Sequence, residues 1–518
     1  MLKLLKVCGV MLAVSMLSSC ASLGESVPNL VANAADEASG ASAKTAQWFA
    51  DNRHSPLRLR AFLKKMPKGG DIHTHLSGAV YAESYLQWAT DEKRCVNPET
   101  GVISEDNHEP CQVKPEVPVA TAMKDSELYG KLVDKMSLRN LEYAEQSGHD
   151  QFFEAFTKFA GGSKGQMIAE LSNRASRQNI AYLEMLITVG KKYSKQFSQQ
   201  VHFAGDIDAA YQQIIAAGLP GTIAAGQQEL QGVEQQAKAA LACDSANAQA
   251  GCAVERRYLL QINRTGEPSR VFAEMVYAFE TAKAEPLAVG VNMVAPEDNV
   301  VALRDYDLHM RMIGYLSARY PDVPVSLHAG ELVLGLVPPD HLHDHIRKAV
   351  EVAGAKRVGH GVDVMHEDNP FQLLKTMKDN NVLVEVCLTS NDAILGVEGK
   401  QHPFPEYLKA GVPATLASDD EGISRIDLTH EYQRAALDYG LSYPDLKTLA
   451  RNSIHYAFLD GASLWSNPTY RQMQTACNKA DLAKPSASCQ QFLDENDKAK
   501  VEWTLERQFR AFENGNWM

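Results

Sequence analysis

The sequence predicts an α/β fold, a (β/α)8 TIM barrel with an N-terminal helical extension and insertions at its rim. The main observation is a series of eight short apolar runs, each followed by a longer segment with helical spacing, which is typical of parallel strands joined by crossover helices. The runs cover residues 69–76, 180–187, 256–263, 285–294, 323–331, 356–362, 381–389 and 412–420. The second observation is size, because 518 residues with 45% hydrophobic content can bury a large core.

Composition divides the chain into four parts. Residues 1–19 have the pattern of an export signal, and residues 20–60 are expected to form a tether and an N-terminal helical arm. The barrel is predicted over 61–465, with polar insertions near 91–125 and 218–256 that decorate its rim, and 466–518 form a C-terminal helical segment. After the last strand, Ser442 to Asp445 mark a helix start.

A formal net charge of −13 disfavours nucleic acid as a partner and favours a small neutral substrate.

The export signal has two early lysines, an apolar stretch too short to span a membrane and then small residues. Leu17 to Cys20 resembles a bacterial lipobox, in which the signal is removed and Cys20 becomes the lipidated first residue. An ordinary signal peptide that is cut nearby is the alternative. We expect an exported protein that contacts a membrane through a lipid anchor only, at the outer membrane, facing the periplasm or the cell surface.

Six of the nine cysteines form three close pairs in polar, turn-rich segments, as expected for a protein that folds in an oxidising compartment. The predicted disulfides are Cys95–Cys111, Cys243–Cys252 and Cys477–Cys489. Cys387 lies in an apolar run and is expected to be a free core thiol. No CxxC spacing occurs, which argues against a zinc cluster of cysteines.

Titratable side chains stand at four of the strand ends, where a purely structural sequence would favour valine or leucine. The first group is His73 and His75, which lie two apart, so that on a strand they project to the same side and can share a metal ion. The others are His328-Ala329-Gly330-Glu331, Gly359-His360-Gly361 and Ser418-Asp419-Asp420. Each alone could be a satisfied buried polar group or a turn. Together they indicate an active site, because the carboxyl ends of barrel strands form one face.

Two other metal arrangements are less favoured. His341, His343 and His345 lead into a helical stretch, where neighbours two apart diverge, so we interpret them as a solvated helix start. A two-metal site would need a bridging ligand, typically a carboxylated lysine, at a middle strand end. The runs at 256–263 and 285–294 offer none.

The motifs MPKGGDIHTHLSGA, SLHAGE, RVGHGV, VEVCLTSN and LASDDEG, in this order, resemble the adenosine deaminase family of the amidohydrolase superfamily. The N-terminal extension and export signal are closest in layout to its secreted, growth-factor-related branch, here in a bacterial lipoprotein form. The resemblance implies one Zn²⁺ per chain, a metal that accepts three imidazoles and one carboxylate well. The implied ligands are His73, His75, His328 and Asp419.

The resemblance also implies roles for the remaining groups. Zinc lowers the pKa of its water toward about 7. His360 would orient that water and take up its proton, and Glu331 would be the general acid that protonates N1 of a purine. Glu331 therefore needs a raised pKa in a dry site. Asp420 would share a hydrogen bond with the N7 edge, and a helix N-cap role is the structural alternative that can coexist with it.

Substrate contacts are expected from Asp420, Ser77, Ala295 and Gly330, and two of these depart from the family pattern. Ser77 stands where many family members carry an acidic residue that meets the ribose 5′-hydroxyl. Ala295, followed by Pro296, replaces a glycine that approaches the purine edge, which restricts the backbone there. In addition, Glu421 replaces the usual proline after Asp420.

The resulting hypothesis is zinc-dependent hydrolytic deamination of adenosine and 2′-deoxyadenosine to inosine and ammonia, in purine nucleoside salvage outside the cytoplasmic membrane. One alternative is deamination of another aminopurine, such as adenine or a modified or 5′-altered nucleoside. Another is a catalytically silent nucleoside-binding lipoprotein. The expected partner is a small purine nucleoside, and the sequence leaves a homodimer open.

Overall fold

The computed structural model describes residues 40–144, 146–201, 203–478 and 480–515. The predicted export signal and the lipidation of Cys20 lie outside the described residues. Among the described helices, none is both long enough and apolar enough to cross a membrane.

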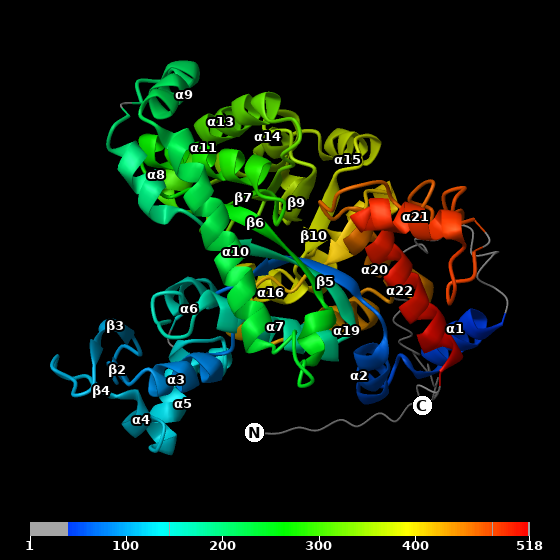
Figure 1. Ribbon diagram of the computed structural model, residues 1–518, viewed down its shortest axis with the longest axis horizontal. Coiled ribbons are helices and arrows are strands. Elements are labelled where there is room, and N and C mark those ends of the chain that lie inside the picture. Colours follow the sequence, from blue (N-terminus) through cyan, green and yellow to red (C-terminus); the bar gives the residue numbers. More distant parts are fainter. Residues whose placement is uncertain (1–39, 145, 202, 479, 516–518) are drawn as a thin grey trace, which may run out of the picture.

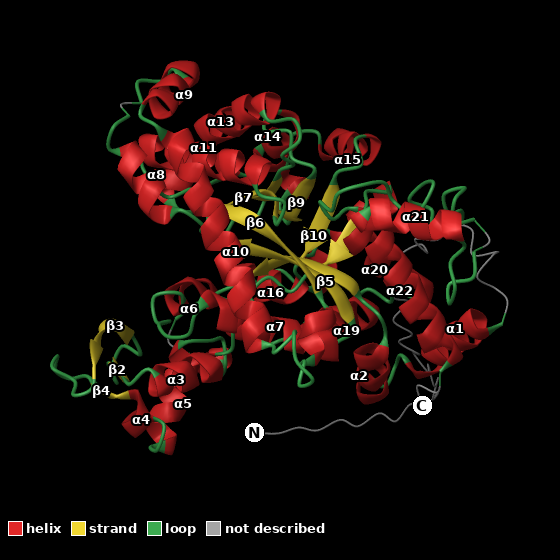
Figure 2. Cartoon of the chain, in the orientation of Figure 1, coloured by secondary structure: helices red, strands yellow, loops and turns green. Residues whose placement is uncertain are grey.

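Eight parallel strands form the centre of the molecule, and each coincides with one of the predicted apolar runs. They are β1 (Gly69–His75), β5 (Ile180–Ile187), β6 (Glu255–Asn263), β7 (Ala288–Val294), β8 (Ser326–Ala329), β9 (Arg357–His360), β10 (Leu383–Val386) and β11 (Ala414–Leu416). Every residue of β5 and of β10 is buried, because helices cover the outside of the strands while side chains fill the inside. Figure 2 shows the strands gathered at the centre with helices around them.

The strands close into a barrel. They form two four-stranded parallel sheets, in the orders β1-β5-β6-β7 and β8-β9-β10-β11. A parallel bridge between Val291 and Val325 joins β7 to β8, and one between Thr74 and Asp419 joins β1 to the end of β11. The backbone N–H of Asp419 donates to the carbonyl of His73 at 3.0 Å, and that of His75 donates to Asp419 at 3.0 Å. The α/β barrel prediction is therefore confirmed.

The outer helices follow from periodic burial and local start signals. In α11 (Pro268–Ala284), proline opens the first turn, and buried Phe272, Met275 and Phe279 recur at helical spacing. Helix α20 (Tyr443–His455) begins at the predicted place, with Ser442 and Asp445 forming a capping box. Other outer helices are α7 (Lys164–Arg177), α13 (Tyr306–Arg319), α14 (His345–Glu351), α15 (Pro370–Asp379), α17 (Phe404–Ala410) and α19 (Leu428–Asp438).

The first predicted insertion forms a lobe beside the barrel, which we call the insertion lobe (residues 82–135). It contains α3 (Ala82–Asp91), β2 (Arg94–Val96), β3 (Ile103–His108), β4 (Val117–Pro118), α4 (Val119–Ala122) and α5 (Ser126–Lys135). Its three strands pair antiparallel in the order β3-β2-β4 and pack on a small apolar core of their own. Figure 1 shows the lobe projecting from the body of the molecule.

The second predicted insertion, 218–256, is not a rim decoration. Most of it is α10 (Ile223–Ala240), which packs against α7 and α11 and is the crossover helix between β5 and β6. The loop that follows α10 leads into the start of β6, on the barrel face opposite the strand ends that carry the titratable groups. Its long, polar, alanine-rich and glutamine-rich sequence suggested an addition, but tertiary packing makes it part of the helical layer.

The two ends of the described chain pack together against the barrel. The N-terminal arm forms α1 (Ala41–Asn52) and α2 (Pro56–Lys65), and the C-terminal segment forms α21 (Ala487–Glu495) and α22 (Asp497–Asn514). The rings of Phe62 and Phe512 meet edge to face, with centroids 5.0 Å apart. Helices thus occupy most of the described part of the predicted arm and residues 487–495 and 497–514 of the predicted C-terminal segment, whereas the described residues between 466 and 486 form no helix, and the predicted boundary at 60/61 falls inside α2.

The structure contains all three predicted disulfides, Cys95–Cys111, Cys243–Cys252 and Cys477–Cys489. The first crosslinks two segments within the insertion lobe, the second closes the loop between α10 and β6, and the third crosslinks the C-terminal segment. Cys387 is a buried free thiol, as expected.

Candidate metal centre and active site

The carboxyl ends of the barrel strands surround a cavity of about 360 Å³. Polar side chains that follow different strands converge there, because parallel strands end at the same face of a barrel. Those in the cavity wall include His75, His328, Glu331, His360, Asp419 and Asp420. His73, which is fully buried, completes the group. The structure thus brings together every residue for which the sequence predicted a metal or catalytic role.

Four donor atoms converge in this group, one each from His73, His75, His328 and Asp419. Nε2 of His328 lies 3.1 Å from Nε2 of His73 and 3.0 Å from Nε2 of His75. Oδ1 of Asp419 lies 3.5 Å and 3.3 Å from the same two nitrogens. Ligands held about 2.0–2.1 Å from a tetrahedral zinc ion lie about 3.4 Å apart, so the spacing suits such an ion.

Hydrogen bonds on the far side of two rings determine where their lone pairs point. Nδ1 of His73 lies 2.6 Å from the Glu385 carboxylate, and Nδ1 of His328 lies 2.8 Å from the Asn292 amide oxygen. Both oxygens accept, so each Nδ1 carries a ring proton, and in the neutral imidazole, the form that binds a metal ion, each Nε2 carries a lone pair. These lone pairs face each other across 3.1 Å, an arrangement that a cation between them would stabilise. The donor set therefore fits a divalent metal ion.

Asp419 is held ionised as the fourth donor. Ser390 donates its hydroxyl to Oδ2 at 2.7 Å, which leaves Oδ1 for the metal site. Burial raises the pKa of Asp419, but its contacts with His73 and His75 outweigh the effect of burial and keep the pKa well below its usual range.

A buried charge cluster supports His73 from behind. Arg357 contacts Glu385 at 2.6 Å and Glu184 at 2.5 Å, and all three side chains are fully buried. Burial raises the pKa of Glu385, while Arg357 and His73 lower it below the usual value. Sequence reasoning missed this cluster. The sequence did carry a signal for it, because Glu184 and Glu385 each lie within a strongly apolar run. Burying an ion without a partner costs much free energy, so each glutamate required a buried partner.

Glu331 has the raised pKa that its predicted role requires. The side chain is 7% exposed, and burial, aided by the negative charges of Asp419 and Glu297, raises its pKa to about 8. The carboxyl is therefore protonated at neutral pH and can donate a proton. Its Oε1 lies 3.7 Å from Nε2 of His360.

Glu297 was not predicted, and it holds the turn that carries Glu331. The backbone N–H groups of Gly330 and Glu331 donate to its carboxylate at 3.2 Å and 2.8 Å. Gly330 has φ of +75°, and a Cβ there would lie 2.4 Å from Asp363. The sequence suggested that Gly330 contacts the substrate. Gly330 shapes the turn instead, because its N–H donates to Glu297 and it does not line the cavity.

The interpretation of the second histidine run as solvated is wrong for His345. Its ring is 3% exposed, stacks on Tyr306 with centroids 3.6 Å apart and contacts Glu297 through Nδ1 at 2.7 Å. A helix does begin here, since α14 starts at His345. The histidine therefore supports the active-site turn.

A directed chain of hydrogen bonds sets the tautomer of His360. The backbone N–H of Phe404 can only donate, and it does so to Nδ1 of His402 at 3.1 Å. Nε2 of His402 then donates to the Asn391 amide oxygen at 3.0 Å, and the amide nitrogen donates to Nδ1 of His360 at 2.9 Å. Burial lowers the pKa of His360 to about 3, so the ring is neutral and its proton lies on Nε2, facing the site.

Asp420 points a carboxyl oxygen at the cavity. Among the described residues, Oδ1 is buried and has no hydrogen-bond partner. Burial and the charge of Asp419 raise its pKa well above the usual value. The side chain does not cap α18 (Glu421–Ser424), so the N-cap alternative is not observed. A Cβ on Gly78 would lie 1.5 Å from Oδ1, so only glycine permits this close approach.

Residues 219–463 match the family model described as adenosine deaminase. An adenosine deaminase of Shewanella loihica is 29% identical over 39% of this chain and 57% of that protein. An adenine deaminase of Rhizobium rhizogenes is 31% identical over 40% of this chain and 60% of that protein. The chain is therefore similar to the adenosine deaminase family over just under half of its length.

The matches cover little more than half the length of these two relatives. Among solved structures, Arabidopsis ADAL in complex with IMP is 18% identical, with a TM-score of 0.49 over 77% of this chain and 94% of that one.

Two departures from the adenosine deaminase pattern lie in the cavity wall. Ala295 has φ of +85°, a backbone conformation that costs a non-glycine residue about 1–2 kcal/mol. Ser77 is exposed and lies at the cavity edge. A third departure, Glu421, is buried and paired with Arg174 at 2.6 Å, outside the cavity wall.

Proposed function

We propose that this protein is a zinc-dependent deaminase that hydrolyses adenosine and 2′-deoxyadenosine to inosine and ammonia. One observation carries the proposal, namely the buried carboxyl of Glu331, whose pKa burial raises to about 8, beside four donor atoms arranged for a metal ion. A general acid and an electrophilic centre on one face of a cavity are what addition of water to a purine requires. The family match supports the same reaction class.

Zinc bound by His73, His75, His328 and Asp419 would supply the Lewis acidity that makes water a nucleophile at neutral pH. Glu331 donates its proton to N1 of the purine, which makes C6 electron-poor enough to accept attack by water. The amino group at C6 then takes up a proton that the attacking water releases and leaves as ammonia, while the proton from Glu331 stays on N1 of the product.

His360 orients the attacking water. In the tautomer that the hydrogen-bond chain sets, its Nε2–H donates to the water oxygen, which aligns a lone pair toward C6. Accepting the proton of the water, the other role predicted for this residue, first requires Nε2 to lose the proton it carries. Asp420, whose raised pKa favours the protonated form, donates a hydrogen bond to N7.

The proposed setting is outside the cytoplasmic membrane, with the mature protein anchored through Cys20. The three disulfides support export, because such bonds persist in oxidising compartments. The helical N-terminal arm fits the resemblance in layout to the secreted branch of the family.

The deciding experiment follows the ultraviolet absorbance of adenosine incubated with the soluble protein that begins at Ala21. Zinc-loaded wild type should convert adenosine to inosine, and chelator-treated protein and Glu331→Gln should not. Glu367→Gln is the matched control, because Glu367 is also a buried carboxyl with a raised pKa, of about 7, but lies outside the cavity wall. Loss of activity in this control, or undiminished turnover in Glu331→Gln, would contradict the assignment.

A second candidate is another aminopurine. The adenine deaminase relative matches as well as the adenosine deaminase relative, and Ser77 and Ala295 both change the wall of the cavity. Parallel assays with adenine and 2′-deoxyadenosine separate the candidates, since an adenine deaminase would leave both nucleosides intact.

A further inference from the structure

A second pocket, of about 510 Å³, lies between the insertion lobe and the barrel. Two of its lining residues, Ser77 and Phe156, also line the catalytic cavity, so the two spaces meet at these residues. The pocket is larger than the catalytic cavity of about 360 Å³. The adjoining space is therefore large enough to hold a sizeable substituent of a molecule whose purine lies at the metal centre.

The proposed orientation of the purine directs its sugar toward this junction. N1 and N7 lie on opposite sides of the ring system, and Glu331 and Asp420 would hold them respectively. N9, which carries the sugar, shares the five-membered ring with N7, so the sugar lies on the Asp420 side. Gly78 is packed directly against Asp420, and its neighbour Ser77 is the residue that both spaces share. The 5′ end of the sugar thus faces the second pocket.

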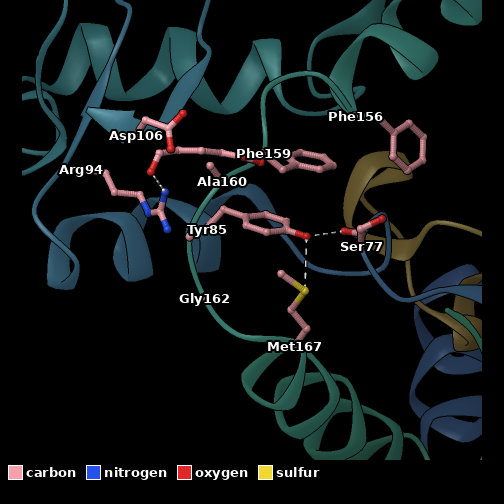
Figure 3. A pocket seen from close by; sticks show the side chains of 11 residues that line it. Ser77, Tyr85, Arg94, Asp106, Phe156, Phe159, Ala160, Gly162 and Met167 are labelled. Carbon is pink, nitrogen blue, oxygen red and sulfur yellow. Dashed lines mark hydrogen bonds between the residues drawn. The ribbon is translucent and has the colours of Figure 1, made fainter. Parts of the chain in front are cut away.

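The part of the pocket next to Ser77 is apolar. The rings of Tyr85 and Phe159 stack in parallel with centroids 4.6 Å apart, and Met167 lies against the Tyr85 hydroxyl. Tyr85 donates its hydroxyl to the carbonyl of Ser77 at 2.8 Å, which holds this wall against the junction. Figure 3 shows the two rings between Ser77 at one end of the pocket and Arg94 and Asp106 at the other.

The far end of the pocket is negatively charged. Arg94 is already paired with Glu92 at 2.5 Å, and one of its terminal nitrogens donates to the backbone carbonyls of Ser104 and Glu105. Within the described parts of the chain, the side-chain carboxylates of Glu105 and Asp106 have no ion-pair partner, although both line the pocket. An apolar passage that ends at two unpaired carboxylates is complementary to an alkyl or thioether chain with a terminal ammonium.

We propose that this pocket is a subsite for the 5′ substituent of purine nucleosides, and that it selects an apolar chain ending in a cationic amine. The inference rests on the proposed deaminase function and specifies its substrate class. It also explains Ser77, because an acidic side chain at the junction would bind a free 5′-hydroxyl and narrow the passage. The insertion lobe then acts as the specificity element of the enzyme.

The test measures kcat/KM for adenosine, 5′-deoxy-5′-(3-aminopropylthio)adenosine, its uncharged isostere 5′-deoxy-5′-(butylthio)adenosine, and adenosine 5′-monophosphate. The amine should exceed the butyl compound by about five- to tenfold, as two partly solvated carboxylates allow. The monophosphate should be the poorest substrate. In E105Q/D106N the ratio of amine to butyl compound should fall to about one while adenosine turnover is unchanged.

A control variant, E99Q/E109Q, also removes two negative charges from the insertion lobe, but at exposed positions that do not line the pocket. It should preserve the ratio. Equal rates for the amine and the butyl compound in wild type, or a preference for the monophosphate, would overturn the proposed selectivity. Adenosine turnover with no turnover of either thioether would refute the subsite. If adenosine is not deaminated, the proposed function fails, and calorimetric binding of the same two thioethers then decides the subsite separately.

Discussion

Replacing Glu331 by glutamine tests both its protonation and its role. The folded protein raises the pKa of this carboxyl from 4.5 to about 8 through burial and the nearby charges of Asp419 and Glu297. At pH 7 the folded state therefore holds a proton that the unfolded state has released. Keeping the carboxyl protonated costs about 1.4 kcal/mol per pH unit above 4.5, or about 3 kcal/mol at pH 7.

Glu331→Gln has no such cost, so the metal-free variant should be more stable than metal-free wild type at pH 7. For a chain of this length, about 3 kcal/mol corresponds to a rise in Tm of about 3 °C. The sign follows from proton binding: wild-type stability falls as pH rises from 4.5 toward 8, because over this range only the folded state keeps the proton. The difference between the two proteins should therefore vanish near pH 4.5.

The same substitution should lower kcat by about 10²- to 10⁴-fold, the usual contribution of a general acid. Calorimetric melts between pH 4.5 and pH 8, together with the adenosine assay, check both halves of the prediction. A variant that is less stable than wild type at pH 7, or a stability difference that does not depend on pH, would refute the conclusion that Glu331 is protonated at pH 7 in the folded protein. A loss of kcat smaller than about fivefold would refute its catalytic role.

Three further outcomes are expected. Glu385→Gln should weaken metal binding by about 10- to 100-fold, because it weakens the hydrogen bond that orients His73 through Nδ1. Competition with a chelator measures the affinity, and an unchanged affinity would contradict this support role. Asn391→Leu should lower kcat by about 10- to 100-fold with full metal content, since it breaks the hydrogen-bond chain that sets the tautomer of His360, and a loss of metal instead would point to a structural role. A hydrogen bond that His149 donates to the Asp298 carboxylate raises the pKa of His149 to about 9, so the link from α6 (Gly148–Ala155) to the loop after β7 is complete below pH 6.5 and is lost as pH rises through 9. His149→Ala should therefore raise KM at pH 7 but not above pH 9, where an effect of equal size would argue against the ionic link.

Much of the site was predictable because it follows from chain direction alone. Parallel strands must end on one face of a barrel, so His73, His328, His360 and Asp419 were expected to meet although 346 residues separate the first from the last. The disulfides were predictable for a related reason, because each joins cysteines close in sequence within a polar segment.

The supporting residues depend on packing between segments that are distant in the chain. Glu297, on the loop after β7, holds the turn after β8 and contacts His345 at the start of α14. The sequence shows that His345 begins a helix, but whether it faces solvent or an active-site carboxylate depends on how that helix lies against the barrel. The same limit applies to α10, whose polar composition suggested a rim insertion although it forms part of the helical layer.

By itself, then, the sequence predicted the barrel from strand periodicity, and it placed titratable side chains at four strand ends that topology carries to one face. The roles of metal donor and general acid came from the resemblance to the adenosine deaminase family. Tertiary structure decided the raised pKa of Glu331, the tautomer of His360 and the pocket beneath the insertion lobe. These properties arise from desolvation and from hydrogen-bond direction, and both depend on which distant groups surround a side chain after the chain has folded.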